Sequence, residues 1–166
     1  MSNIGNSKIA EMYVGGTKIA QAYLGSVLVF ALPSGYDSYK VHITWSSNDN
    51  FNMAGLKING VQATQAQCTS IWYYQDNTWN ELSSSDRNVA IDWSNDGGKG
   101  MYGTAIDINF TSDDPVTQVQ IHTGKWYGGG SMTVTMHVAG VKDGVETDLG
   151  YTSEANSADK TYTINV

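Results

Sequence analysis

Apolar and polar residues alternate with a period of two along much of this chain, and residues 116–138 show the pattern most clearly. Such alternation of β-branched with polar residues is typical of half-buried strands. In the first half of this stretch Gln118, Gln120 and His122 occupy the polar phase, and Thr133, Thr135 and His137 occupy it in the second half. A glycine-rich segment, residues 124–131, separates the halves. The pattern predicts two strands joined as a central hairpin.

Further alternating runs predict many more short strands after residue 36. Turn-forming pairs separate several of them: Asn59-Gly60, Asp76-Asn77 and Asp143-Gly144. Polar loops are expected at 46–52 and 94–100. Many short strands with frequent turns predict an all-β fold, a β-sandwich or jelly roll. The apolar phases of the expected strands are Tyr39/Val41/Ile43/Trp45, Leu56/Ile58, Ile71/Tyr73, Val89/Ile91/Trp93, Ile106/Ile108/Phe110 and Tyr162/Ile164/Val166.

The first thirty residues contain an internal repeat. Residues 8–15, KIAEMYVG, align with residues 18–25, KIAQAYLG, and a third strand is expected at 27–30. Each unit is expected to form a short strand that ends in a glycine turn. These strands are too few to bury a core of their own, so they must pack on the remaining chain or on other copies. Pro33 and Gly35 suggest a linker, which divides the chain into domains at 1–32 and 36–166.

Composition narrows the class of partner. The 166 residues carry a net charge of −7 and only nine Lys and Arg, which disfavours nucleic acid and anionic membranes. The single cysteine, Cys68, permits no intrachain disulfide and is expected to be a buried apolar residue. The N-terminus lacks the pattern of a signal peptide. We expect synthesis in a cytoplasm and, if the protein works outside the cell, exit by a route other than secretion.

The N-terminal repeat resembles a short repeat of tailed-phage virion proteins. The carrying pattern is K-I-x-x-x-Y-x-G-x-x-K-I-x-x-x-Y-x-G-S-x-x-V-F, within residues 4–30. In tail-fibre, head-fibre and other appendage proteins it lies near the chain end. The resemblance implies a phage structural protein located in the virion, often a homotrimer, in which this segment serves attachment or oligomerisation. An ordinary β-meander at a domain edge is the alternative interpretation.

The later domain resembles the galactose-binding-like sandwich of discoidin (coagulation factor 5/8 C-type) domains. The similarity is carried by residues 39–44 with 53–58, by 88–93 as an "A-x-D-x-x-W" region, and by 105–110 with 116–121. The strand order departs from the family, Thr104 stands where the family has Trp, and the family's disulfide is absent. The resemblance implies the fold more than it implies a ligand.

Aromatic side chains in and beside the loops are the main candidates for a binding site. An indole or phenol face can stack on the C–H face of a sugar ring while neighbouring polar groups bond its hydroxyls. Alternatively, these rings fill the core or a subunit interface. The candidate glycan platform consists of Trp126, Tyr127, Lys125, Trp93, Tyr102, Trp72, Tyr74, Asp76 and Asn77.

Catalytic and metal-binding patterns are sparse. His42, His122 and His137 all fall on the polar phase of expected strands, which could place them on one outward sheet face, but no recognisable metal spacing accompanies them. The start of a calcium-binding loop is matched by Asp92, Ser94 and Asp96, although the Glu that closes such a loop is missing. Calcium is the only cofactor that the sequence suggests. The alternative interpretation of this stretch is a plain surface turn. No catalytic residues are assigned, and we expect a non-enzymatic protein.

Three functions fit these observations. The first is a phage tail or head fibre or other appendage whose sandwich binds a cell-surface glycan and whose other partners are virion proteins. The second is a capsid decoration or head-fibre subunit that makes only protein–protein contacts. The third is a carbohydrate-binding module of a bacterial glycan-degrading enzyme.

Overall fold

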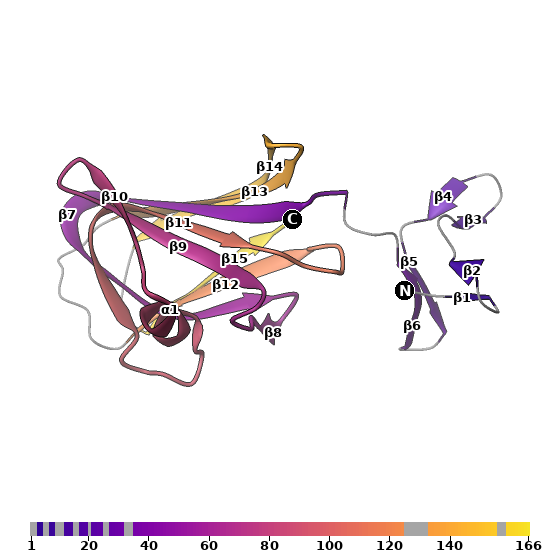
Figure 1. Cartoon of the computed structure of the whole chain (residues 1–166), viewed down its shortest axis with the longest axis horizontal. Helices are drawn as coiled ribbons and strands as arrows, with labels where there is room; N and C mark the ends of the chain where they lie inside the picture. Colours follow the sequence, from indigo (N-terminus) through magenta and orange to yellow (C-terminus); the bar gives the residue numbers. More distant parts are fainter. Residues whose placement is uncertain are drawn as a thin grey trace. The chain divides into compact units, whose positions relative to one another are not determined.

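In the computed structural model, strands account for 64% of the chain, which confirms the predicted all-β class. The structure describes residues 3–4, 7–8, 12–14, 17–19, 21–24, 27–31, 35–124, 133–155 and 159–166. The chain forms two compact units: residues 1–35 with 112–115, and residues 36–111 with 116–166 (Figure 1).

The smaller unit contains three two-stranded sheets. The strands pair antiparallel in sequence order, β1 with β2, β3 with β4 and β5 with β6. Each repeat unit therefore begins in the second strand of one hairpin and ends in the first strand of the next. The bounds are β1 Asn3–Ile4, β2 Ser7–Lys8, β3 Met12–Val14, β4 Thr17–Ile19, β5 Gln21–Leu24 and β6 Val27–Ala31.

The larger unit is a nine-stranded antiparallel sheet that nearly closes on itself, as expected for a sandwich or barrel-like fold. Its main path runs β10-β9-β11-β7-β12-β15, and the β13–β14 hairpin joins it along β7. The bounds are β7 Ser38–Ile58, β8 Val61–Gln62, β9 Cys68–Gln75, β10 Thr78–Glu81, β11 Lys99–Phe110, β12 Gln118–Thr123, β13 Thr133–Lys142, β14 Val145–Ala155 and β15 Thr161–Asn165.

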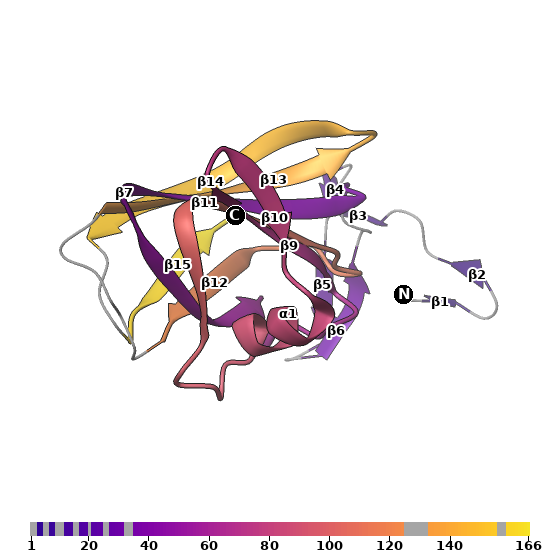
Figure 2. The same ribbon diagram turned by 60° about the vertical axis from the view of Figure 1, so that its left-hand side comes forward.

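The polar loop expected at 46–52 is wrong, because β7 runs through it as one long strand. Residues 49–53 of β7 pair with residues 99–103 of β11. Phe51 and Met53 are completely buried, so this segment belongs to the core. The run of polar residues that suggested a loop instead lies in the middle of this strand. Both halves of β7 pair with β11, while the first half also pairs with β13 and the second with β12 (Figure 2).

The central hairpin predicted for 116–138 is also wrong, although both of its strands exist. The strand β12 pairs with β15 and with residues 53–58 of β7, whereas β13 pairs with β14 and with residues 38–45 of β7. The alternation predicts the buried phase of each strand correctly, since Val119, Ile121 and Val134 are fully buried. Period-two patterns determine which face is buried and carry no information about the partner strand.

The strand expected at 89–93 is wrong, because residues 89–91 belong to the helix α1, Ser84–Ile91, while Asp92 is its C-cap and Trp93 lies in the following turn. The hydroxyl of Ser83 accepts a hydrogen bond from the backbone N–H of Asp86 at 3.2 Å, which is an N-cap arrangement. The helix buries Ala90 and Ile91 and packs beside β7, β9 and β11. The apolar spacing at 89 and 91 is compatible with a short helix as well as with a strand.

The core is continuous and contains the strand positions expected from the alternation, including Tyr39, Ile43, Ile108 and Tyr162. Cys68 is buried among them, as predicted. The predicted turns at 59–60, 76–77 and 143–144 are confirmed as two-residue connections whose residues all have positive φ. Positive φ at both central residues is the mark of the type I′ hairpin turn, which favours Asn, Asp and Gly.

Candidate ligand-binding site

One row of side chains crosses the outward face of the sheet. Trp72 on β9 lies opposite Asp107 on β11, Asp107 lies opposite His42 on β7, His42 lies opposite His137 on β13, and His137 lies opposite Tyr151 on β14. Residues directly opposite in an antiparallel pair project from the same face. On β9, β11, β7 and β13 the residues beside this row in sequence include core residues such as Ile71, Ile106 and Val41, so the row faces away from the core.

The imidazole of His42 is oriented by Asp107. The Nδ1 atom of His42 lies 2.5 Å from Oδ1 of Asp107, whose side chain is only 20% exposed. A carboxylate only accepts hydrogen bonds, so Nδ1 of His42 carries the proton and donates it. In the neutral imidazole, the Nε2 atom is therefore left as an acceptor for a second partner.

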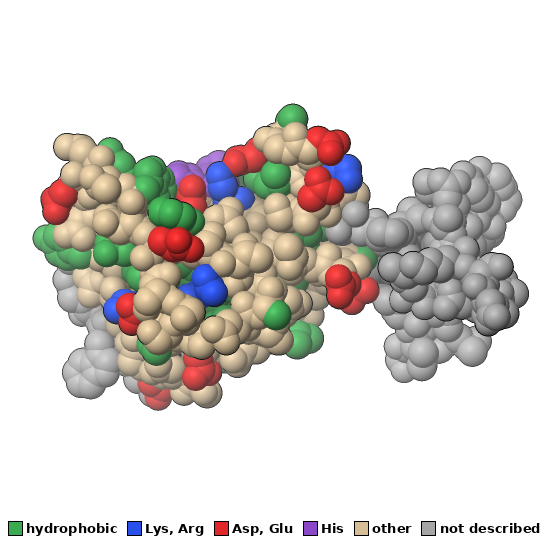
Figure 3. All heavy atoms as spheres, in the orientation of Figure 1, with side chains coloured by type: hydrophobic (Ala, Val, Ile, Leu, Met, Phe, Trp, Pro, Cys, Tyr) green, Lys and Arg blue, Asp and Glu red, His purple; other side chains and the backbone are tan. Residues whose placement is uncertain are grey.

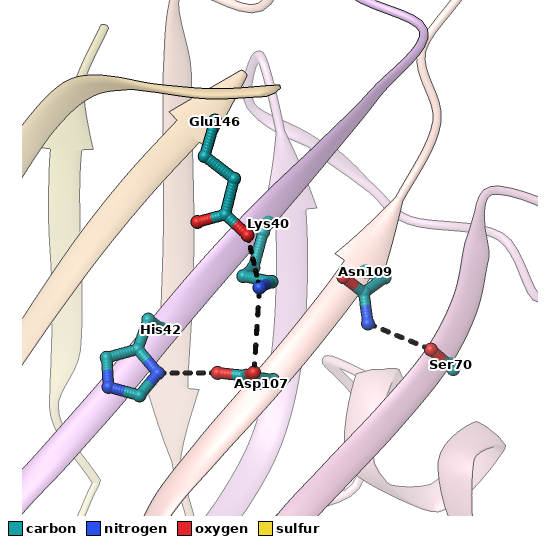
Figure 4. A network of polar contacts seen from close by, with 6 residues as sticks. All are labelled: Lys40, His42, Ser70, Asp107, Asn109 and Glu146. Atoms are coloured by element: carbon teal, nitrogen blue, oxygen red, sulfur yellow. Dashed lines mark hydrogen bonds and ion pairs between the residues drawn. The ribbon is translucent and has the colours of Figure 1, made fainter. Parts of the chain in front are cut away.

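Lys40 links this pair to β14. Its Nζ lies 2.5 Å from Oε1 of Glu146 and 3.8 Å from Oδ2 of Asp107, as drawn in Figure 4. The hydrogen bond to Glu146 is the main reason that the pKa of Lys40 is raised, with the nearby charge of Asp107 adding to it. In the next row, Asn109 donates from Nδ2 to the Ser70 hydroxyl at 3.0 Å.

The side chains of Lys40, His42 and Asp107 line a groove of about 540 Å³, which we call the outer-face groove. In Figure 3, histidine side chains lie next to basic and acidic ones along the upper edge of the molecule. A concave site with a few converging polar groups is the usual form of a ligand site. The groove is lined by Lys40, His42, Asp107, His137, Ala139, Glu146 and Asp148.

An aromatic flank adjoins the groove: His137 lines the groove, and its cross-strand neighbour Tyr151 lies outside the lining. The rings of His137 and Tyr151 stack with centroids 5.4 Å apart and planes at 19°. The Nδ1 atom of His137 also lies 4.0 Å from Asp148, whose side chain is 66% exposed. Tyr151 itself is 67% exposed, so the flank presents a broad ring surface rather than a packed core contact.

The structure gathers part of the predicted platform beside this groove. Tyr74 and Trp79 pair across β9 and β10 with their rings 5.3 Å apart, and Tyr74 lies opposite Ala105, one row from Trp72 and Asp107. Trp79 is 40% exposed. The connecting Asp76 and Asn77 form the turn between β9 and β10. These aromatics share the outward face with the groove.

The remaining described platform residues lie elsewhere. Tyr102 is half-exposed and lines a separate hollow of about 260 Å³ with Tyr73, Lys99 and Asp86. Trp93 is partly buried, and its ring lies close to Gly55. The ring stacks on His122 with centroids 5.2 Å apart, and Nζ of Lys57 lies 3.9 Å from its centroid in a cation–π contact. Lys125, Trp126 and Tyr127 lie outside the described residues.

The three residues of the calcium-like stretch form a local turn. Asp92 accepts hydrogen bonds from the backbone N–H and the hydroxyl of Ser94, at 3.0 and 2.7 Å. The hydroxyl of Ser94 is the main reason that the pKa of Asp92 is lowered. Asp96 is exposed. Within the part of the chain that the structure describes, no group of three or more His, Cys, Asp or Glu side chains is placed to hold a metal ion.

The polar phase of the alternation predicts that His42, His122 and His137 could lie on one sheet face, and His42 and His137 do. His122 does not join them; it stacks on Trp93 and lies 3.2 Å from Asp159. No sequence motif singles out Lys40, Asp107, Glu146 and Asp148, because they lie on outward strand phases or near a turn without any distinctive spacing. Strand register alone brings them to the histidines.

Comparison with known proteins found no matching family model, curated protein or solved structure. Among the helices of the described residues, none has the length and apolar character needed to cross a membrane.

Proposed function

We propose that this chain is a non-enzymatic structural protein of a phage virion, a tail fibre, head fibre or other appendage, whose sandwich binds a glycan on the host surface. The outer-face groove is the observation that carries the binding role. It combines hydrogen-bonding groups held in place by their neighbours with the adjoining aromatic flank, where the exposed Tyr151 ring stacks on His137. Sugars need both, because their rings have an apolar C–H face edged by hydroxyls.

The assignment to a virion rests on the N-terminal repeat. Its three small hairpins lack the size to form an independent core, which suits a segment that docks on another protein or on copies of itself. A homotrimer would present three sandwich domains together, and linked weak sites gain avidity. That gain supports a trimeric adhesin with a shallow groove.

A capsid decoration protein that makes only protein contacts is the second candidate. The exposed aromatic side chains of Trp79 and Tyr102 favour it, since aromatic residues are enriched in protein interfaces. It differs from the first candidate in requiring no sugar.

Two measurements on the full-length chain test this proposal. A glycan array measures sugar binding, and light scattering measures the mass of the oligomer. We expect a trimer that binds a defined set of glycans, with Tyr151→Ala losing binding while its far-ultraviolet circular dichroism is unchanged. A full-length chain that binds no glycan but attaches to purified capsids would support the decoration protein instead.

A further inference from the structure

We propose that the outer-face groove selects uncharged, hydroxyl-rich sugars and rejects acidic glycans. This inference rests on the proposed glycan-binding function and specifies the class of ligand. Charge, hydrogen-bonding character and shape of the groove each lead to it.

The charge of the groove disfavours an anionic ligand. Three carboxylates line it, those of Asp107, Glu146 and Asp148, against the single ammonium of Lys40. Lys40 is already held by Glu146 and lies within 4 Å of Asp107, so its charge is largely neutralised inside the site. A sialic acid, uronate or sulfate would enter a region of net negative charge on a chain that is itself at −7.

The hydrogen-bonding groups require a ligand rich in donors. Carboxylates only accept, and Nε2 of neutral His42 also accepts because Nδ1 donates to Asp107. Asp148 has its carboxylate 66% exposed and its nearest ion-pair partner, His137, 4.0 Å away. Sugar hydroxyls can donate to these groups, whereas a ligand carboxylate or sulfate presents further acceptors at the same positions.

The groove also offers apolar surface of the right kind. The methyl group of Ala139, opposite Lys40 and two residues from His137 on β13, lines the groove, and the His137 ring stacks on Tyr151. The row from Trp72 to Tyr151 crosses four strand intervals, roughly 19 Å at about 4.8 Å each. That length accommodates several linked sugar rings with an aromatic residue at each end.

The experiment compares matched pairs of oligosaccharides on the full-length chain. The neutral probes end in galactose, glucose, mannose or an N-acetylhexosamine, and each acidic counterpart carries an added sialic acid, uronate or sulfate. We expect at least one neutral probe to bind, and its acidic counterpart to bind about tenfold more weakly or worse.

Two groove variants locate the site. Ala139→Trp fills the floor and should abolish binding of the neutral probe. Asp148→Asn removes the negative charge of one hydrogen-bond acceptor. The affinity for the neutral probe should fall by about tenfold, the effect of losing one hydrogen bond to a charged group. The ratio of neutral-probe affinity to acidic-probe affinity should also become smaller. Asp113→Asn is the matched control, because it removes the same charge from a residue outside the unit that carries the groove.

The outcomes separate the two proposals. If no probe binds, glycan binding and the ligand class both fail. If neutral probes bind and neither groove variant weakens them, the chain binds glycans elsewhere and the groove assignment is wrong. If an acidic probe binds at least as tightly as its neutral counterpart and Ala139→Trp abolishes that binding, the groove is the site and the inferred ligand class is overturned.

Discussion

His42 and Asp107 are 65 positions apart in the chain and lie directly opposite each other on β7 and β11, joined by a 2.5 Å contact between Nδ1 and Oδ1. The contact sets which nitrogen of His42 carries the proton. It therefore decides what the outer-face groove offers a ligand.

We predict that neutral His42 is protonated at Nδ1. At a pH where the imidazole is uncharged, nitrogen-15 NMR should show this single tautomer, because the Asp107 carboxylate accepts only from an N–H. In Asp107→Ala the restraint is gone, and a mixture of tautomers should appear. His122 is the internal control, since its contacts are with Thr161, Asp159 and Trp93. An unchanged His42 spectrum in the variant would contradict the assignment.

Asp37 should titrate at lower pH than an ordinary carboxyl group. The pKa of Asp37 is lowered by its hydrogen bond with Lys142 and by the backbone N–H of Asp143, at 2.8 and 2.9 Å. A lowered pKa means that the stabilisation is complete above the ordinary carboxyl pKa and is lost as the pH falls through the lowered value. NMR titration should show the Asp37 midpoint rising in Lys142→Met, while Lys57→Met leaves it in place. Equal midpoints in the wild type and Lys142→Met would refute this.

Cys68 should be inert in the folded protein. Burial raises the pKa of its thiol to about 11, partly offset by Arg87, and the side chain is inaccessible. At pH 8 only about 0.1% would be thiolate, against about a quarter for an ordinary thiol of pKa about 8.5. We expect reaction with Ellman's reagent to be at least about a hundredfold slower than in denaturant. Rapid reaction under native conditions would show that β9 is more accessible than the structure indicates.

Gly103→Ala should be strongly destabilising. Gly103 has φ +156°, and an added Cβ would lie 2.1 Å from the carbonyl oxygen of Tyr74, which is backbone and cannot rotate away. We expect a loss of at least about 2 kcal/mol in the free energy of unfolding, measured by urea denaturation. Gly35→Ala is the control, because its Cβ would meet nothing within 4 Å. A variant as stable as that control would mean that β11 relaxes at its bulge.

Residues 36–166 should fold without the repeat segment. The continuous core lies entirely within this range. We predict that the truncated chain is a monomer with a cooperative thermal transition, because the segment that we propose to trimerise the protein is gone. Light scattering and calorimetry check both points. A truncated chain that remained trimeric would remove the oligomerisation role from the repeat.

Local sequence determined much of the strand content. Val41, Ile43, Ile106 and Ile108 alternate with polar residues because successive side chains of a strand point to opposite faces. The dipeptide Asp143-Gly144 indicated its turn because few residues adopt positive φ without strain. These features depend on a few adjacent residues, so the sequence by itself was sufficient.

Tertiary structure decided which strands pair and which side chains become neighbours. The strand β7 continues through a polar run of sequence at Phe51. Pairing with β11 and burial of Phe51 in the core outweigh the preference of the surrounding polar residues for a loop. Val89 belongs to a helix because its segment is capped by Ser83 and packs on strands distant in sequence. The register of β7 with β11 and β13 aligned His42 with Asp107 and His137. It also brought Glu146 of β14 within hydrogen-bonding reach of Lys40. Periodicity shows which face a side chain occupies, but only the folded sheet determines which side chains become its neighbours.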